Sequence, residues 1–281
     1  MAKSRIEKAI YILAVILFIL FTVGPIVWAF IISVTPESEQ LASTTDLLPS
    51  YLYFGNYQEL FDQSGSAHQV VFGGLMNSLK AAFLTIVIGV PVAFLTAYAF
   101  YRFRFKGKRF LVSSLMVTMI IPVFATIVPI YAIFANNGLL DDLKWVAVIY
   151  VTAFLPLNTW VMINFFQSLP KELFEAAQVE GANEGRIFID IVLPLAWPVI
   201  LTSTLLMFLA SWSQYQIPLI LTSSQNTKVV TLVLADFMGR DSINYGMIAA
   251  SGIITLLPPS IIAILFRKHL ISGLSQGSIK G

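Results

Sequence analysis

Six long apolar runs, separated by polar segments, limit the possible fold of this chain more than any other feature. They lie at about 10–34, 75–101, 110–134, 145–166, 195–221 and 246–266. About 20 apolar residues suffice for an α-helix to cross the hydrocarbon layer of a bilayer. Helices satisfy their own backbone hydrogen bonds there. The pattern therefore predicts an all-α integral membrane protein with six transmembrane helices, forming a single domain over residues 1–281.

The composition supports the same class. Hydrophobic residues make up 57% of the chain and charged residues 11%, whereas soluble domains carry roughly 25% charged residues. The chain has no cysteine, which excludes disulfides, thiolate metal sites and a cysteine nucleophile. The two histidines, His68 and His269, are far apart, and we interpret them as solvated residues. No metal site is predicted.

The distribution of lysine and arginine predicts the orientation of the six helices. Four basic residues fall in segments on one side of the predicted membrane, namely Lys80, Lys144, Lys228 and Arg240. The other thirteen fall on the opposite side, five of them in the basic turn 102–109. Cytoplasmic loops carry the excess of basic residues. We therefore expect both termini and the tail 267–281 in the cytoplasm, and the polar segment 35–74 outside.

A polar segment of different character, 168–194, lies between the fourth and fifth runs. It contains seven charged residues, and each would cost roughly 2.5–3.5 kcal/mol at the centre of a membrane-spanning helix. Leu173, Ala176 and Ala177 recur at helical spacing and predict one apolar face. Gly181 suits the reversal between two short helices, and Pro194 is expected to end the second. The segment is predicted to be a helix–turn–helix exposed to water.

Seven residues of this segment resemble the EAA loop of ATP-binding cassette (ABC) importer permeases, the element that couples them to their ATPases. They are Glu175, Ala176, Ala177, Gly181, Ile191, Leu193 and Pro194. The tail Gly273-Leu274-Ser275-Gln276-Gly277 also fits the GxSxG pattern of a nucleophile elbow. That motif needs a downstream histidine, and here none follows. The tail instead resembles the C-terminus of carbohydrate importer permeases, similar to the maltose-transporter permease family.

The resemblance implies a non-catalytic membrane subunit of a sugar importer in the cytoplasmic membrane of a bacterium or archaeon. The implied partners are a second, dissimilar permease, an ATPase dimer, an extracytoplasmic solute-binding protein, a carbohydrate substrate and membrane lipid. ATP and Mg²⁺ would bind to the ATPases, and no cofactor to this chain. The chain itself lacks the GxxxxGK[ST] phosphate-binding motif. Nothing in the sequence indicates a nucleic-acid partner.

Polar uncharged residues gather in the fifth run and predict the translocation pathway. Thr204, Ser211 and Tyr215 share one helical face, with Trp212 and Gln214 beside it. Aromatic rings with hydroxyl and amide groups suit a sugar, but such residues also pack membrane helices together. Both interpretations stay open. The candidates are Ser211, Trp212, Gln214 and Tyr215, with Asn77 and Asn158 as weaker ones.

Three alternatives compete with a sugar importer. A permease for phosphate, peptides or amino acids would share the EAA-like loop, and only the tail argues against it. A secondary carrier is disfavoured because the runs have no Asp, Glu, Lys or Arg near their centres. A membrane enzyme would need a catalytic constellation that the motif search does not find. In related permeases the tryptophan of the fifth run is often followed by Asn and an acidic residue, whereas here Ser213 and Gln214 follow Trp212.

Overall fold

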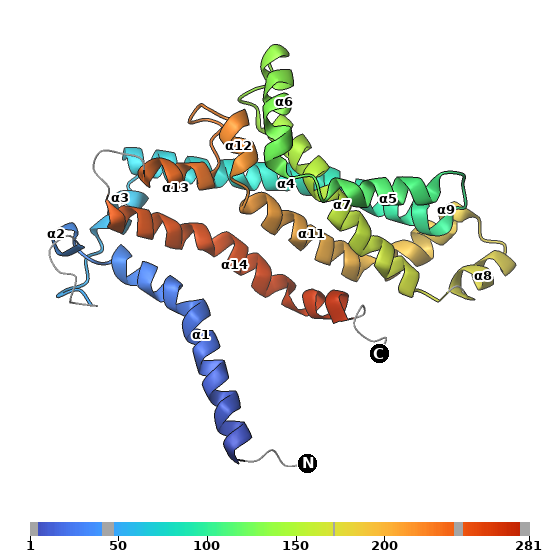
Figure 1. The fold of residues 1–281 in the computed structure, drawn as a ribbon, viewed down its shortest axis with the longest axis horizontal. Coiled ribbons are helices and arrows are strands. Elements are labelled where there is room, and N and C mark those ends of the chain that lie inside the picture. The colour runs from blue at the N-terminus through green and yellow to red at the C-terminus, as the bar shows by residue number, and fades with distance from the viewer. Residues whose placement is uncertain (1–4, 41–47, 171, 239–243, 276–281) are drawn as a thin grey trace. The chain divides into compact units, whose positions relative to one another are not determined.

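The computed structural model describes residues 5–40, 48–170, 172–238 and 244–275. Within these ranges the chain is helical and contains no strand (Figure 1). The first seven helices are α1 Arg5–Ser33, α2 Glu37–Gln40, α3 Gly55–Phe61, α4 Ser66–Arg102, α5 Lys108–Thr118, α6 Val123–Asn136 and α7 Leu143–Ser168. They are followed by α8 Glu172–Val179, α9 Glu184–Ile187, a π-helical turn Phe188–Val192, α10 Leu193–Leu195, α11 Trp197–Trp212, α12 Gln216–Leu221, α13 Val230–Met238 and α14 Tyr245–Ser275.

Among the described residues, four helices are long and apolar enough to cross a membrane. They are α1, α4, α7 and α14. Two further spans are obtained if each of two bent helix pairs crosses as one unit, namely α5 with α6, and Glu184–Leu195 with α11. The prediction of an all-helical protein with several membrane-spanning helices is therefore confirmed, with four to six candidate spans.

Prolines explain why two predicted spans are not straight helices. The run 110–134 breaks after Thr118, and α5 and α6 meet at 94°. Pro122 would bring its ring against the carbonyl of Thr118 in a continuous helix, because proline clashes with the residue four positions earlier. The backbone of Pro122 is therefore extended, with φ −68° and ψ 137°.

The run 195–221 is likewise divided between α11 and α12. Pro218 cannot donate to the carbonyl of Gln214 and would clash with it. The helix accordingly stops at Trp212, and the freed Gln214 carbonyl accepts a hydrogen bond from the Thr231 hydroxyl at 2.8 Å. The loop 222–245 that follows also contains α13.

Pro194 does not end the second short helix, contrary to the sequence prediction. The π-helical turn Phe188–Val192 precedes it and α10 contains it. The helix bends by 66° at Ala196, two residues before Pro198. A π-helical turn changes the usual backbone pairing, and such turns can kink a helix and are frequent at functional sites.

The chain divides into two compact units. The first comprises 1–73 and 233–257, and the second 74–232 and 258–281. In the first unit, Asn56 donates to the Ser33 carbonyl at 2.9 Å and the Tyr57 hydroxyl lies 2.8 Å from that of Ser33. Helix α4 already begins at Ser66 and α3 precedes it, so 35–74 is less of a loop than predicted. His68 stacks on Phe72, with ring centroids 4.4 Å apart.

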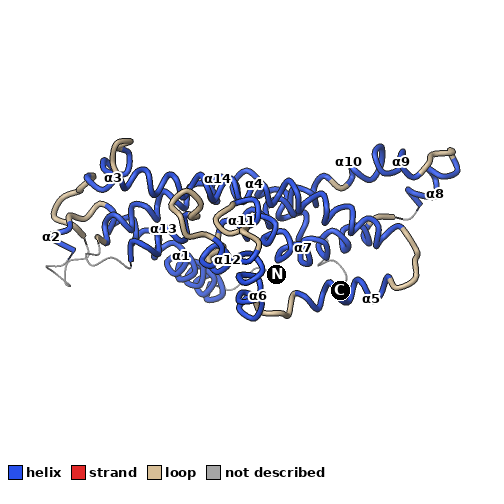
Figure 2. The backbone as a smooth tube through the Cα atoms, turned by 90° about the horizontal axis from the view of Figure 1, so that it is seen from above, coloured by secondary structure: helices blue, strands red, loops and turns tan. Residues whose placement is uncertain are grey.

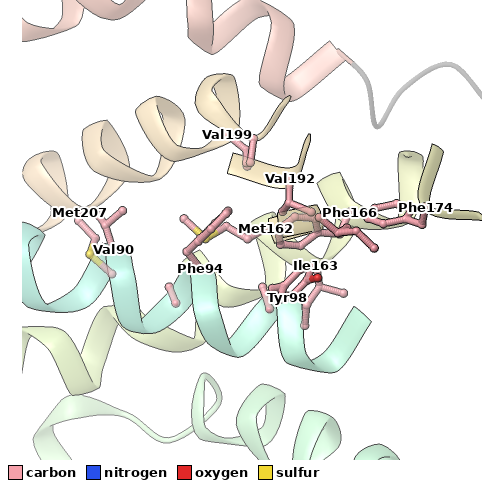
Figure 3. Packing of buried hydrophobic residues seen from close by; sticks show 14 of the residues in the cluster. Val90, Phe94, Tyr98, Met162, Ile163, Phe166, Phe174, Val192, Val199 and Met207 are labelled. Carbon is pink, nitrogen blue, oxygen red and sulfur yellow. The ribbon is translucent and has the colours of Figure 1, made fainter. Parts of the chain in front are cut away.

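The core of the second unit lies where α4, α7, α8 and α11 converge, as Figure 3 shows. Phe166 of α7 is fully buried at its centre. Its ring centroid lies 5.5 Å from that of Phe94 and 5.8 Å from those of Tyr98 and Tyr101. Aromatic contacts of this kind stabilise packing beyond the area they bury. The core therefore joins two long helices directly to the segment that resembles the EAA loop.

Candidate functional site

The EAA-like segment folds as two short helices joined by a tight turn. Helix α8 ends in a Schellman motif, in which the Ala182 amide donates to the Ala177 carbonyl and the Gly181 amide to the Gln178 carbonyl, both at 3.0 Å. Gly181 has a φ of +81°, which glycine adopts without steric cost. The turn predicted at Gly181 is confirmed. Figure 2 shows α8, α9 and α10 following one another at one end of the backbone.

The second short helix begins at a capped position. The Asn183 side chain accepts a hydrogen bond from the Arg186 amide at 2.9 Å, which satisfies one of the free amides at a helix start. Arg186 and Asp190 form an exposed ion pair at 3.4 Å. The turn at Gly181 and the cap at Asn183 together fix the direction of α9 relative to α8, although only four residues separate the two helices.

A charged pair connects this turn to the end of α4. Arg102, the last residue of α4, donates through Nε to Glu184 Oε2 at 3.0 Å and through a second nitrogen to Oε1. Tyr98 Oη and Gln178 Nε2 also lie 3.4 Å from this carboxylate. Such two-point pairing fixes geometry as well as charge. The hydrogen bonds from Arg102 lower the pKa of Glu184 below its ordinary value and outweigh the effect of burial.

An aromatic contact holds α8 on the same support. Phe174 is buried, and its ring centroid lies 5.8 Å from that of Tyr101. The Arg102 guanidinium lies 5.5 Å from the centre of the Phe174 ring, within the range of a cation–π interaction. Phe188 of the π-helical turn packs against Tyr98 with centroids 5.0 Å apart. No local sequence pattern marks Phe174, Tyr98 or Arg102, because their partners lie far away in the sequence.

The predicted apolar face of α8 is wrong in one respect. Ala177 is buried with Phe174 in the core of the chain itself, whereas Leu173 and Ala176 are exposed. Val179 joins the exposed side with 89% of its surface accessible. The helix therefore has two apolar sides. One packs against Tyr101, and the other, formed by Leu173, Ala176 and Val179, is free within the described chain.

The remaining motif residues differ in accessibility. Glu175, Leu193 and Pro194 are exposed, and Ile191 is half-buried against the core. Within the described part of the chain, Glu175 forms no ion pair or side-chain hydrogen bond, and Glu184 makes the ion pair that secures the loop. Whether the seven motif residues contact an ATPase stays a prediction.

The pathway candidates of the fifth run do not share one continuous helix face. Ser211 and Trp212 are buried at the end of α11, where Trp212 stacks on Phe208 at 5.6 Å. The Ser211 hydroxyl is buried and has no hydrogen-bond partner among the described residues. Gln214 folds back to accept from the Tyr215 and Gln216 amides at 3.0 and 3.1 Å. Tyr215 lies beyond the helix end and is 39% exposed. Their pathway role stays a prediction.

The two asparagine candidates connect segments of the chain. Asn158 of α7 donates to the Phe154 carbonyl at 2.9 Å and accepts from the Ser203 hydroxyl of α11 at 2.6 Å. Asn77 donates to the carbonyls of Asn226 and Lys228, both at 3.0 Å. These contacts correspond to the helix-packing interpretation that the sequence left open, and a pathway role for either residue is untested.

A second polar anchor lies at Asp141, in the turn between α6 and α7. One carboxylate oxygen accepts from the Ser223 amide at 2.7 Å, the Ser224 amide at 2.9 Å and the Thr227 hydroxyl at 2.7 Å, and the other from the Ser223 hydroxyl at 2.6 Å. Burial raises the pKa of Asp141, but these hydrogen bonds outweigh it and hold the pKa well below its usual range. Asp141 thus fixes the turn before α7 to the loop after α12.

A comparison of the whole sequence with known protein families identifies the family of this chain. Residues 86–276 match the model of the binding-protein-dependent transport system inner membrane component. The chain belongs to this family. The match includes α7, the EAA-like segment and α11, and it confirms the resemblance to ABC importer permeases. With its several apolar helices, the protein is a multi-pass membrane component of a transport system.

Curated relatives cover nearly the whole chain. The trehalose transport permease SugB of Mycobacterium tuberculosis is 30% identical over 261 residues, which is 92% of each chain. The trehalose/maltose permease MalG of Thermococcus litoralis is 27% identical over the full length of both chains. The galactooligosaccharide permease GanQ of Bacillus subtilis is also 27% identical over both full lengths.

A solved structure supports the fold. A chain of a bacterial ABC transporter that imports the acidic polysaccharide alginate superimposes with a TM-score of 0.76 at 21% identity, covering 95% of this chain and 99% of that one. At this level of identity the likeness concerns the fold alone. The helical architecture described above is thus one that an ABC importer subunit adopts.

Proposed function

We propose that this protein is one of two membrane-spanning subunits of an ATP-driven importer that receives a sugar or oligosaccharide from a binding protein. The observation that carries the proposal is the EAA-like loop, folded as a braced helix–turn–helix in a chain of this transporter family. The substrate class rests on the relatives, whose names refer to trehalose, maltose and galactooligosaccharides.

In this proposal the chain has six spans and both termini are in the cytoplasm. The third span is bent between α5 and α6, and the fifth, at about 195–221, contains α11 and α12, so that the loop 168–194 stays in water. A second permease completes the pathway, and two ATPase subunits bind and hydrolyse ATP with Mg²⁺. This chain binds no cofactor and catalyses no reaction. Its membrane is the cytoplasmic membrane of a bacterium or archaeon.

The EAA-like loop would transmit the movement of the ATPases. The exposed side of α8, with Leu173, Ala176 and Val179, is suited to a groove on the partner, as amphipathic helices are in helix-in-groove recognition. Phe174 and the Arg102–Glu184 pair join the opposite side of the loop to α4 and α7. A push on α8 is therefore passed to two long helices as a rigid-body motion.

The solute would pass near the junction of α11 and α12. The break after Trp212 interrupts a helix at membrane depth, and non-helical backbone is tolerated there only where protein or a water-filled cavity surrounds it. Ser211, Gln214 and Tyr215 surround this break and offer hydroxyl, amide and aromatic groups. The alternative of a phosphate, peptide or amino acid importer is less favoured because the relatives named above handle sugars.

Uptake into vesicles tests the proposal. The chain is co-expressed with a second permease, an ATPase and a binding protein of the same organism, and the complex is reconstituted with ATP inside the vesicles. We expect ATP-dependent uptake of labelled maltose or trehalose and none of phosphate or a dipeptide. Uptake of phosphate or the dipeptide instead would contradict the substrate class.

Reporter fusions test the topology separately. A reporter active only outside the cytoplasm should work after Glu59 or Gln225 and fail after Lys106, Glu184 or Gly281. Activity after Glu184 would contradict the cytoplasmic position of the loop.

A further inference from the structure

The turn between α4 and α5 concentrates positive charge that the chain does not neutralise. Arg104, Lys106 and Arg109 are exposed, and within the described ranges none of them forms an ion pair or side-chain hydrogen bond. Arg102 is different because Glu184 pairs with it. Three cations within six residues repel one another, so this turn attracts an external anion.

The turn is held in a defined shape. The Phe103 ring packs edge-on against Tyr98 with centroids 6.1 Å apart, and Phe105 stacks on Phe100 at 6.2 Å. Lys108 Nζ donates to the Phe103 carbonyl at 3.2 Å. Gly107 has a φ of +86°, a conformation that favours glycine. The free cations therefore sit on a preformed support.

These residues surround a hollow. It has a volume of about 550 Å³ and is lined by Arg104, Phe105, Gly107, Lys108, Arg109 and Phe110. Phe110 is 74% exposed and Phe105 is 42% exposed. The hollow thus combines cationic groups with accessible phenylalanine rings, a combination that interfacial helices use at the boundary of lipid headgroups and acyl chains.

The position of the turn identifies the kind of anion. It follows the last residue of α4, an apolar helix long enough to span a membrane, and Figure 1 shows it leading into α5. The predicted span 75–101 ends just before the turn, which places the turn near the lipid headgroups. Basic clusters next to a membrane helix recognise anionic headgroups. A soluble anion would not need the exposed phenylalanines.

We propose that the basic turn Phe103–Phe110 is a binding site for the headgroup of an anionic phospholipid. Arg104 and Arg109 contact the phosphodiester, because guanidinium groups donate two parallel hydrogen bonds to phosphate oxygens. Phe105 and Phe110 lie against the glycerol and the start of the acyl chains. The site is distinct from the coupling loop and from the pathway candidates, and it does not depend on which solute is transported.

Native mass spectrometry of the full-length protein tests the proposal. The probes are phosphatidylglycerol and phosphatidylcholine with the same acyl chains, titrated into the detergent-solubilised protein. We expect phosphatidylglycerol to be retained at lower lipid concentration. The Arg104→Gln/Arg109→Gln variant should weaken its binding by about five-fold per residue, or about twenty-five-fold in total. Equal retention of the two lipids would overturn the proposal.

A control variant and a rescue variant make the test specific. Lys80→Gln/Lys144→Gln removes the same charge from exposed positions elsewhere. Because salt screens distant exposed charges, phosphatidylglycerol binding should stay within about two-fold of that of the unmodified protein. Arg104→Lys/Arg109→Lys keeps the charge but loses the two-point hydrogen bonds, so its binding should lie between that of the unmodified protein and that of the glutamine variant. An equal loss in the control variant would overturn the site.

Two further outcomes would also overturn the proposal. One is displacement of the lipid by glycerol 3-phosphate at matched concentration, which would indicate a soluble phosphate compound as ligand. The other is cross-linking of a photoreactive residue at position 106 to another subunit, and not to lipid, in the assembled complex. Exclusive cross-linking to phosphatidylglycerol supports the proposal.

Discussion

The guanidinium of Arg102 and the carboxylate of Glu184, 82 positions apart in the sequence, form a two-point pair that joins α4 to the turn of the EAA-like loop. Their side chains are 19% and 44% exposed. Water screens a pair of this kind, so it contributes only about 1 kcal/mol to stability. The main effect of the pair is on geometry and not on stability, because it fixes the position of the loop relative to α4.

Breaking this pair should uncouple the transporter more than it destabilises the chain. Arg102→Glu or Glu184→Arg alone should lower solute-stimulated ATP turnover per assembled complex several-fold. The double variant Arg102→Glu/Glu184→Arg should recover much of it, because the pair is re-formed with reversed polarity. The control is Arg186→Gln, which removes an exposed ion pair from the same loop. Equal turnover in the single and double variants would contradict the coupling role.

Two residues on opposite sides of α8 should separate folding from partner binding. Phe174→Ala removes a buried ring that contacts Tyr101 and Arg102, and such deletions cost about 3–5 kcal/mol in well-packed cores. Val179→Ala changes a side chain that is 89% exposed and should alter stability by less than about 0.5 kcal/mol. Thermal unfolding measures the first effect.

Co-purification of the ATPase measures partner binding by the exposed side of α8. Val179→Ala should weaken ATPase attachment although the chain remains fully folded. Unchanged ATPase recovery would exclude the exposed side of α8 as the docking surface.

Replacement of Gly181 should change the stability of this chain through backbone strain alone. A Cβ built at this position meets no atom within 4 Å, but φ is +81°. Gly181→Ala should therefore lower the free energy of unfolding by about 1 kcal/mol. Gly181→Asn should cost less, because Asn tolerates the left-handed region. A larger loss for Asn than for Ala would contradict the strain explanation.

Gly181→Asp then tests the coupling role of the turn. It should leave the chain inserted and paired with the second permease, but weaken ATPase attachment and abolish solute-stimulated hydrolysis. Transport and ATP turnover, normalised to assembled complex, are the measurements. Normal coupled turnover would contradict a role for this turn in transmission.

The Asp141 anchor should make stability depend on acid pH. Its pKa is lower in the folded chain than in the unfolded one, so its stabilising contribution is complete above the unfolded value. That contribution is progressively lost as the pH falls below about 4, where the unfolded state takes up the proton. Asp141→Asn keeps the shape and tolerates the φ of 57°, but removes the charge.

Thermal unfolding of both proteins between pH 6 and pH 3 measures this dependence. The unmodified protein should be more stable at pH 6, and its advantage over Asp141→Asn should shrink towards pH 3. A constant difference over this range would show that the carboxylate charge does not contribute.

The pathway candidates beside the α11–α12 break should affect transport but not assembly. Gln214→Ala and Tyr215→Ala should each lower sugar uptake several-fold while the ATPase still co-purifies. Ser213→Ala is the control, because the Ser213 hydroxyl is engaged with the Leu209 carbonyl of its own helix at 2.9 Å. Normal uptake in both test variants would favour the packing interpretation of these residues.

The sequence predicted the features that depend on local composition. The length and apolarity of the runs determine membrane-spanning helices, because each satisfies its own backbone hydrogen bonds. The reversal at Gly181 follows from the conformational freedom of one residue. The EAA-like motif led to the family because its residue types and spacing lie within twenty positions. The lengths of the apolar runs also predicted six spans. They did not reveal that two of these spans, 110–134 and 195–221, are interrupted near prolines.

Only the tertiary structure decided which side of a short amphipathic element is buried and which distant residues support it. Helix α8 has two apolar sides, and its sequence fits either one as the buried side. The rings of Tyr101 and Phe166, brought together by the packing of α4 and α7, select Phe174 and Ala177. Arg102–Glu184 and Asp141–Ser223 each join residues 82 positions apart. Such contacts depend on how helices pack in space, and no periodicity along the chain encodes them.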